Sequence, residues 1–347
     1  MDFNLLKKLC TSCGVSGDES GCKNLIKDIM KTLCDEIEDI KGSNLYCIKY
    51  AKKDNAPTVV IDAHMDSVGF MVKEINEKGT VKFDTIGGID KRVLPSLEVI
   101  LHGKEKIKGV ISSIPPHLME DGKEIKLDNM VIDTGYIKGG LENILSVGDR
   151  ITYAPAIDIM GSCITGTYLD NRAGVAVIIE TFEKLKGKEL PFNLVAAFTV
   201  QEEIGLKGAK LFDKEAQLVI VVDVTHGQTP DEKGNEVYEC GKGTAIAYGP
   251  NVHSSYFDMA VNCAEKNKLE YQVEVLEGNS GTNAWAYQVN GLSVPSLIFS
   301  FPLKFMHTPV ETMRISDYDN LKELLFAFLA ELNGDKINSI SNVKEIV

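Results

Sequence analysis

The sequence lacks any run of about 18 or more apolar residues, so no transmembrane helix is expected. Its first residues, MDFNLLKKLCTSCGVSG, show no basic region followed by an apolar core and a cleavage site, so no secretory signal is expected either. Basic residues are in deficit, because 37 Lys and Arg stand against 50 Asp and Glu and the formal net charge is −13. This charge argues against non-specific binding to nucleic acid or anionic membranes and is compatible with binding of cations. We therefore expect no nucleic-acid partner and no membrane partner.

The sequence also lacks the paired cysteine motifs of a structural zinc site. Its eight cysteines are scattered, and the one close pair, Cys10 and Cys13, has no second pair that would complete a tetrahedral site. We expect these two residues to be half-buried thiols on the first helix. Free thiols without an export signal favour a reducing compartment, so the predicted location is the cytoplasm.

An alternation of strand and helix patterns, typical of an α/β protein, occupies both ends of the chain. The 347 residues are enough for one large domain or two. Apolar residues recur at helical spacing over 2–10, 20–40 and 315–333, and Ser316 or Asp317 is the expected N-cap of the last helix. Short runs such as TVVIDAH, NLVAAFTV and LVIVVDV predict buried strands between helices. The expected fold is α/β, with a mixed, mostly parallel sheet flanked by helices.

The middle of the chain has a different pattern. From about residue 69 to residue 161, short alternating segments separated by turn signals predict an all-β region without a good helical period. We therefore expect residues 1–68 and 162–347 to form one α/β domain, and residues 69–161 to form a β-rich insertion in it.

Titratable side chains follow several of the predicted strands, at the place where an open α/β sheet binds its ligands. Each has an ordinary structural interpretation when taken alone, since Asp170 resembles a helix N-cap and an acidic pair is usually solvated. Together they would place unpaired charge in one crevice, and a divalent metal resolves this. Mixed imidazole and carboxylate ligands suit zinc, cobalt or manganese. The residues concerned are His64, Asp66, Asp170, Glu202, Glu203, Asp223, His226 and His307.

His64 and Asp66 are two residues apart, so on extended chain they share a face. The Asp66 carboxylate is therefore expected to accept the second ring N–H of His64. Such a contact would fix the tautomer of the imidazole and raise its basicity as a metal ligand.

Five motifs in this order, AHMDSVG, YLDNRAG, TVQEEIGLKGA, VVDVTH and MHTPVE, resemble those of the tetrahedral (TET-type) aminopeptidases, also called glutamyl or deblocking aminopeptidases. These are dinuclear metallopeptidases. The segment GVISSIPPHLME also resembles a recurring segment of the family, and the resemblance runs nearly from end to end. It implies a zinc-peptidase-like fold, an insertion that serves as a dimerisation domain, and a homo-oligomer of twelve subunits in a hollow tetrahedral shell.

Carried over position by position, the resemblance implies two divalent metal ions per subunit. His64 and Asp223 would hold one, Glu203 and His307 would hold the other, and Asp170 would bridge them. Glu202 would be the catalytic base, with Asp66 behind His64. Neighbouring residues on extended chain point to opposite sides, so the adjacent glutamates can serve as one base and one ligand.

Two positions depart from the pattern of the family, in which an acidic residue often follows the segments VTH and GT. Gln228 and Asn283 occupy these places here, which leaves the substrate preference open. His253, in a loop before a helix, and Asn283 are the candidate substrate contacts. His102 and His117, in the insertion, are expected to be structural or interface residues.

The expected reaction is hydrolysis of N-terminal residues from peptides, with a metal-bridged water as the nucleophile and Glu202 as the general base. A dinuclear amidase, a deacylase or a carboxypeptidase on the same sheet is the alternative. A glycosidase is disfavoured, because its two carboxylates come from separate positions and one tryptophan in 347 residues is few for sugar stacking. A non-catalytic binding or assembly protein is the third class.

Overall fold

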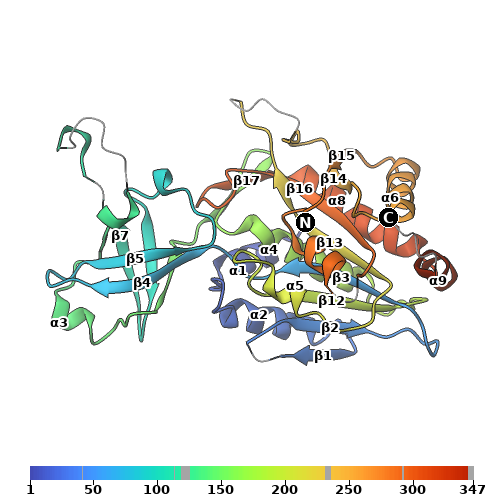
Figure 1. The fold of residues 1–347 in the computed structure, drawn as a ribbon, viewed down its shortest axis with the longest axis horizontal. Helices are drawn as coiled ribbons and strands as arrows, with labels where there is room; N and C mark the ends of the chain where they lie inside the picture. Colours follow the sequence, from blue (N-terminus) through green and yellow to red (C-terminus); the bar gives the residue numbers. More distant parts are fainter. Residues whose placement is uncertain (41, 113, 119–125, 231–235, 291–292, 343–347) are drawn as a thin grey trace.

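One large mixed β-sheet runs through the computed structural model of the chain, which describes residues 1–347 except 41, 113, 119–125, 231–235, 291–292 and 343–347 (Figure 1). Two further strands extend this sheet beside β16 (Ser296–Lys304), because β14 (Thr244–Tyr248) pairs with both β16 and β15 (Tyr271–Val275). Across the sheet the order is β1 (Glu36–Asp39), β2 (Leu45–Lys49), β12 (Asn193–Thr199), β3 (Thr58–His64), β13 (Leu218–His226), β16 (Ser296–Lys304), β17 (Glu311–Arg314), β11 (Cys163–Gly166) and β10 (Ile157–Met160).

The centre of this sheet is parallel. Strands β12, β3, β13 and β16 are neighbours that run in the same direction, whereas β1, β2, β17, β11 and β10 pair antiparallel. The four central strands are buried along almost their whole length, as expected for a parallel sheet covered on both faces. This confirms the predicted mixed α/β sheet.

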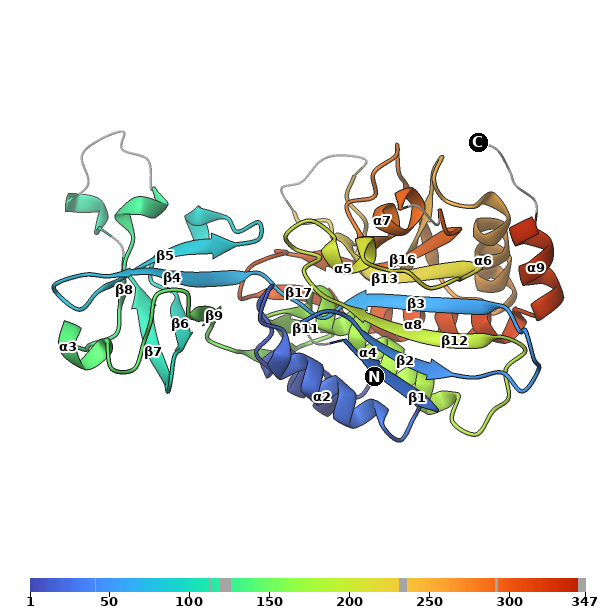
Figure 2. The same ribbon diagram turned by 60° about the horizontal axis from the view of Figure 1, so that its bottom comes forward.

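Helices cover both faces of the sheet (Figure 2). On one face α4 (Leu169–Lys184) packs against β3 and β13, and α8 (Ile315–Glu331) packs against β16 and α4. On the other face α7 (Asn283–Val289) packs against β13, β16 and α5 (Lys207–Lys210). The other helices of this part are α1 (Phe3–Thr11), α2 (Ser20–Met30), α6 (Ser254–Lys266) and α9 (Gly334–Asn342).

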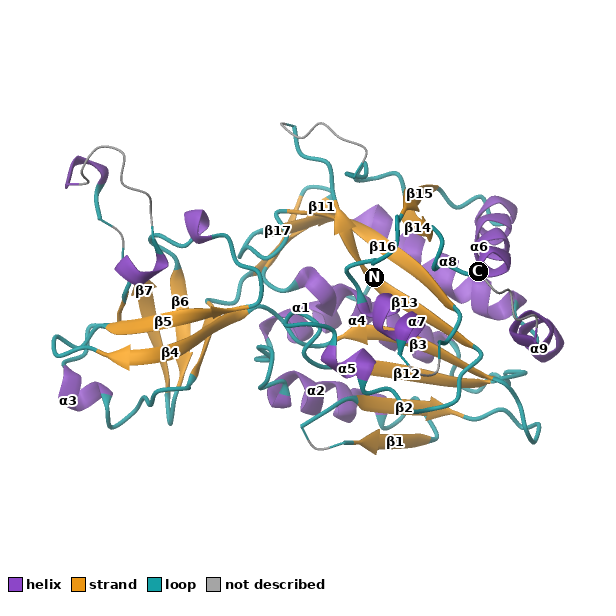
Figure 3. Ribbon diagram, in the orientation of Figure 1, coloured by secondary structure: helices purple, strands orange, loops and turns teal. Residues whose placement is uncertain are grey.

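A small closed β-barrel stands apart from the sheet and has a hydrophobic core of its own (Figure 3). Its strands, in the order in which they close, are β4 (Gly69–Ile75), β5 (Val81–Ile86), β8 (Ile132–Asp133), β7 (Lys106–Ile111), β6 (Glu98–His102) and β9 (Arg150–Tyr153). The same stretch of chain carries the short helical segments η1 (Lys91–Val93), η2 (Pro116–Leu118), η3 (Leu127–Asn129) and α3 (Lys138–Leu141).

The limits 69–161 of the predicted insertion stay a prediction. The barrel strands run from Gly69 to Tyr153, whereas Ile157–Met160 forms β10 and pairs with β11 in the large sheet. Within the segment GVISSIPPHLME, residues 113, 119 and 120 lie outside the described residues.

Three local predictions are wrong. The helix expected over 20–40 ends at Met30, because Glu36–Asp39 pairs with β2 and this strand pairing prevails over the helical spacing. Cys13 follows α1 instead of lying on it, and Cys10 is fully buried. The last helix begins at Ile315, and the carboxylate of Asp317 does not cap it but accepts the backbone N–H groups of Gly241 and Gly243 at 2.7 and 3.0 Å.

Among the described residues, no helix is both long enough and apolar enough to span a membrane.

Candidate metal centre

The carboxyl ends of the parallel strands bring the predicted site residues to one edge of the sheet. His64 ends β3 and is the register partner of Thr199, which ends β12 just before the glutamate pair. Asp223 lies in β13, and His307 lies in the turn that follows β16. Asp170, in the first turn of α4, approaches the same edge. Residues far apart in the sequence thus meet because neighbouring parallel strands end together.

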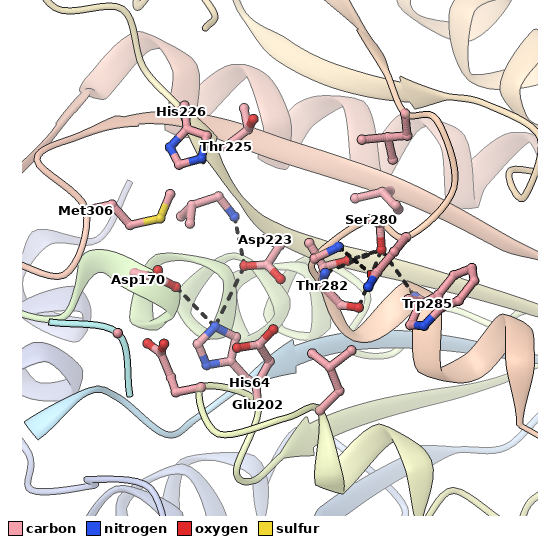
Figure 4. A pocket seen from close by; sticks show the side chains of 18 of the residues that line it. His64, Asp170, Glu202, Asp223, Thr225, His226, Ser280, Thr282, Trp285 and Met306 are labelled. Atoms are coloured by element: carbon pink, nitrogen blue, oxygen red, sulfur yellow. Dashed lines mark hydrogen bonds and ion pairs between the residues drawn. The ribbon is translucent and has the colours of Figure 1, made fainter. Parts of the chain in front are cut away.

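Three of these side chains form a first group of potential metal ligands. The Nε2 atom of His64 lies 3.1 Å from Oδ1 of Asp170 and 3.7 Å from Oδ1 of Asp223 (Figure 4). One ligand atom from each of the three residues lies within 4.8 Å of the others. All three residues are buried, with exposed fractions of 1–5%.

A second group shares Asp170 with the first. Nε2 of His307 lies 3.3 Å from Oδ2 of Asp170 and 3.0 Å from Oε2 of Glu203, and these atoms also fall within 4.8 Å of one another. The two carboxylate oxygens of Asp170 therefore face different histidines. One carboxylate with an oxygen toward each group is an arrangement that can join two cations.

The ring of His64 is oriented by Asp66, although not as expected. Its Nδ1 atom lies 3.1 Å from the backbone carbonyl oxygen of Asp66 and 3.6 Å from the carboxylate Oδ1. Because a carbonyl oxygen only accepts, Nδ1 carries the proton and Nε2 keeps its lone pair for a metal. The prediction that the carboxylate takes this N–H is thus corrected, since the residue after a strand end need not keep the alternation of extended chain.

The carboxylate of Asp66 instead holds the glutamate pair in place. Its Oδ1 accepts the backbone N–H of Glu202 at 3.0 Å, and its Oδ2 accepts that of Glu203 at 3.2 Å. The hydroxyl of Ser16 donates to Oδ2 at 2.6 Å. Asp66 is fully buried, so all three donors serve a charge that water does not reach.

Replacing Asp66 with asparagine is expected to reduce kcat/KM by about 10- to 100-fold, as for other groups that orient metal ligands. The amide would turn one N–H group toward the donors that now bind the carboxylate. Ser16→Ala is the matched control, since it removes only the hydroxyl donor and should cost less. Steady-state kinetics with a metal assay on both variants would decide, and an unchanged kcat/KM in Asp66→Asn would contradict this role.

Glu311 is a residue that the sequence analysis missed. Its Oε1 accepts the backbone N–H of His307 at 2.8 Å, and its Oε2 accepts that of Asp170 at 3.1 Å. The side chain is 2% exposed. This one buried carboxylate therefore positions Asp170 and His307, two of the three ligands in the second group. The sequence signal that could have identified Glu311 is its position as the last residue of the MHTPVE motif.

The charges of the site fit divalent cations. Burial raises the pKa of Asp223 to about 8 and raises that of Glu202 well above its usual range. Burial alone lowers the pKa of His307, but the carboxylates of Asp170 and Glu203 raise it to about 11. Without cations the site would thus retain protons, which metal binding displaces.

One atom gives a separate indication of a missing partner. Oε1 of Glu203 is buried, and it has no hydrogen-bond partner in the part of the chain that the structure describes. Buried carboxylate oxygens are costly without a hydrogen bond or a cation. The donor set and this unpartnered oxygen both fit a metal ion in the second group.

The predicted substrate contacts lie elsewhere. The amide nitrogen of Asn283 donates to Oδ1 of Asp62 and to the hydroxyl of Thr199, both at 2.8 Å, and Asn283 is 1% exposed. His253 precedes α6 and its ring lies beside Tyr256. Neither Asn283 nor His253 is among the residues that line the cavity at the metal groups. The structure therefore gives no support to either as a substrate contact.

The cavity at the metal groups has a volume of about 650 Å³. His64, Asp170, Glu202, Glu203, Asp223 and His307 line it together with His226, which the sequence analysis left unassigned. His102, by contrast, lies in the barrel, where its Nε2 is 2.9 Å from the hydroxyl of Thr152, and His117 lies in η2 of the same region.

The chain is similar to known aminopeptidases over most of its length. Residues 43–324 match the family model of the M42 glutamyl aminopeptidases. The lysyl aminopeptidase of Pyrococcus furiosus is 34% identical over 345 residues, which cover 96% of this chain and 98% of that protein.

Solved structures agree as well. An aminopeptidase from the archaeon Desulfurococcus kamchatkensis superposes with a TM-score of 0.91 at 29% identity, covering 99% of this chain and 98% of that one. The TET1 peptidase of Pyrococcus horikoshii, described as assembling into a tetrahedron or a large octahedral shell, gives a TM-score of 0.84 at 29% identity, covering 95% of this chain and 99% of that one. The chain is thus a metal-dependent aminopeptidase, and it belongs to the M42 glutamyl aminopeptidase family.

Proposed function

We propose that this aminopeptidase works with two divalent metal ions held at the two groups of the candidate metal centre. His64 and Asp223 would hold one ion, Glu203 and His307 would hold the other, and Asp170 would join them. The carrying observation is that Asp170 turns one carboxylate oxygen toward each histidine. Zinc is our assignment for this mixed imidazole and carboxylate set, and cobalt or manganese fits the same donors.

Such ions, when bound, lower the pKa of a water toward neutrality and polarise a carbonyl group. The protein has to supply a group that accepts the proton of this water. Glu202 is our proposal, because it lines the cavity, belongs to neither ligand group and is held by the hydrogen bond of its backbone N–H to Asp66.

Glu202 would accept the proton of the attacking water and then donate it to the amine that leaves. Burial raises the pKa of Glu202 above its usual range, which suits a carboxylate that must both accept and release a proton near neutral pH. Its neighbour Glu203 contributes a ligand oxygen instead, with Oε2 at 3.0 Å from Nε2 of His307.

A free α-amino group on the substrate is the feature that this cavity favours. Five carboxylates line the cavity, and the two that belong to neither ligand group, Glu202 and Glu274, are free to attract an ammonium group at the N-terminus of a peptide. The carboxylates concerned are Asp170, Glu202, Glu203, Asp223 and Glu274.

Aminoacyl amides with a free amine are expected to be hydrolysed, whereas their N-acetylated counterparts should be cleaved at least about 100-fold more slowly, because acetylation removes the cationic group that the cavity attracts. Parallel rate measurements on leucinamide and N-acetyl-leucinamide with the zinc-loaded protein would test this. Cleavage of only the blocked amide would instead favour the deacylase or amidase alternative, and preference for a free carboxylate end would favour the carboxypeptidase.

The assembly is a further part of the proposal. The TET1 peptidase relative assembles into large shells, and we infer that this chain also forms a homo-oligomer, a dodecamer built from dimers, with the barrel as the dimerisation domain. Exposed apolar side chains on the barrel, Leu118, Ile137 and Val147 among them, support an interface there. A native mass of a single chain in solution would contradict this assembly.

The free thiols and the net charge support the proposed location and partners. All eight cysteines carry free thiols, which fits our proposal that the protein acts in the reducing cytoplasm. The net charge of −13 argues against nucleic acid and anionic membranes as partners, and the proposed partners are peptide substrates. Secretion with oxidised thiols would contradict the proposed location, and thiol titration of the native protein would detect it.

A further inference from the structure

His307 is the most exposed of the five proposed metal ligands. It lies in the turn after β16, and its φ of +63° falls in the left-handed region that residues other than glycine rarely adopt. Its side chain is 26% exposed, whereas the side chains of the other four are 2–6% exposed. A ligand in such a turn needs contacts from outside the turn to keep its position. The other four ligands are His64, Asp170, Glu203 and Asp223.

Two of these contacts come from the barrel. The backbone carbonyl oxygen of Gly88, which follows β5, lies 2.7 Å from Nδ1 of His307. Because a carbonyl oxygen only accepts, Nδ1 carries the proton, and Nε2 is the nitrogen that can bind a metal. The hydroxyl of Tyr153, the last residue of β9, donates to the backbone carbonyl oxygen of His307 at 3.0 Å. Strand β9 lies on the side of the barrel that is nearer to the large sheet (Figure 2).

Packing fixes the ring of Tyr153. The residue is 1% exposed, and its ring stacks on that of Tyr168 at 6.0 Å between centroids and meets the ring of Phe70 edge-on at 5.4 Å. The backbone N–H of Tyr153 also donates to the hydroxyl of Tyr168 at 2.8 Å. Tyr168 precedes Asp170 by two residues, so this pair of tyrosines connects β9 with the segments that carry Asp170 and His307. The hydroxyl that holds His307 therefore comes from a rigidly packed side chain.

The first metal group is held from within the α/β part of the chain. Nδ1 of His64 lies 3.1 Å from the backbone oxygen of Asp66, and Oδ1 of Asp223 accepts the backbone N–H of Val224 at 2.9 Å. Loss of a contact from the barrel should therefore weaken the second group and spare the first.

We propose that Tyr153 is a positioning residue, through which the barrel holds His307 in place for the second metal ion. The proposal rests on the two metal ions proposed above, and it gives the barrel a part in the metal centre in addition to its proposed role in dimerisation. Tyr153 acts on the backbone of His307 and contacts neither ion. Groups that orient a metal ligand typically change the affinity for the metal by about 10- to 100-fold.

Tyr153→Phe is the sharpest test, because it removes the hydroxyl and keeps the ring. Stepwise titration of the metal-stripped variant with zinc, followed by calorimetry, is expected to show one ion bound about 10-fold or more weakly than in the wild type and the other bound as tightly as before. The weakened ion should be the one that Glu203→Gln loses. At saturating zinc the activity of Tyr153→Phe should recover.

Tyr318→Phe is the matched control. Tyr318 is fully buried on α8, and its hydroxyl donates to Glu180 at 2.8 Å and not to a residue of the metal centre. This variant also loses one buried hydrogen bond of a tyrosine hydroxyl, but both zinc affinities should stay as in the wild type. The unchanged ion in Tyr153→Phe shows in addition that the variant is folded.

The same titration separates this proposal from the proposed two-metal site. If the wild type binds two ions and both affinities are unchanged in Tyr153→Phe, the positioning role is wrong and the two-metal site stands. If the wild type binds one ion and Tyr153→Phe weakens it about 10-fold or more, the two-metal site is wrong and the positioning role stands. Equal weakening of two ions in Tyr153→Phe would show a general structural effect and would also overturn the positioning role.

Discussion

Replacing Glu202 with glutamine is expected to lower kcat by about 10²- to 10⁴-fold, the usual contribution of a general base, while both metal ions stay bound. Glutamine keeps the size of the side chain and the backbone N–H that bonds Asp66, but it cannot accept a proton. The loss should therefore appear in the chemical step and not in the metal content. Steady-state kinetics together with metal analysis of the purified variant provides both readouts.

The adjacent residue gives the matched control for this prediction. Glu203→Gln makes the same substitution at the next residue, but it removes a ligand carboxylate whose Oε2 lies 3.0 Å from Nε2 of His307. This variant is expected to lose metal from the second group, and added zinc should restore part of its activity. Near-wild-type turnover of Glu202→Gln would show that another group is the base, and metal loss in Glu202→Gln equal to that in Glu203→Gln would show that it is a ligand.

Removal of the metal is expected to abolish hydrolysis and to destabilise the fold around the site. The carboxylates of Asp170, Glu203 and Asp223 would face one another without a metal ion, and Oε1 of Glu203 would stay buried without a partner. Each bound ion stabilises the native state by about 2.7 kcal/mol when its free concentration is 100 times its Kd. Chelation should therefore lower Tm as well as activity, and re-addition of zinc should restore both.

The control for this second prediction is a variant that should bind little metal, like the metal-stripped protein. Asp170→Ala removes the carboxylate shared by both groups, so its activity and its Tm should respond little to either chelator or zinc. A wild-type protein that keeps full activity after exhaustive chelation would exclude a metal-dependent reaction. A Tm that does not change on chelation would exclude the binding of metal at these buried groups.

Much of the candidate site follows from the sequence because it depends on the ends of parallel strands. His64, Asp223 and the glutamate pair each end or follow a buried apolar run, and such runs end at one edge of a parallel sheet. The mixed sheet and the separate β-rich region can also be predicted from the sequence, since strands and helices have different periods of apolar residues. The order of the strands and the closure of the barrel cannot be predicted from it, because pairing between distant segments leaves no local signal.

The parts that could not be predicted depend on side-chain directions and on tertiary contacts. The Asp66 carboxylate binds Glu202 and Glu203 instead of His64, because the chain leaves the strand before it. Glu274 carries no signal in the sequence, and only the pairing of β15 with β14 brings it to the cavity. The helix expected over 20–40 ends early for a similar reason, since β1 pairs with β2.

The most direct test of the dinuclear site is a titration of the metal-stripped wild-type protein with zinc, following leucinamide hydrolysis and bound metal together. The proposed site predicts that activity rises with bound zinc and reaches its plateau at two ions per chain. A plateau at one ion per chain, or activity that is independent of bound zinc, would contradict the assignment of two metal groups joined by Asp170.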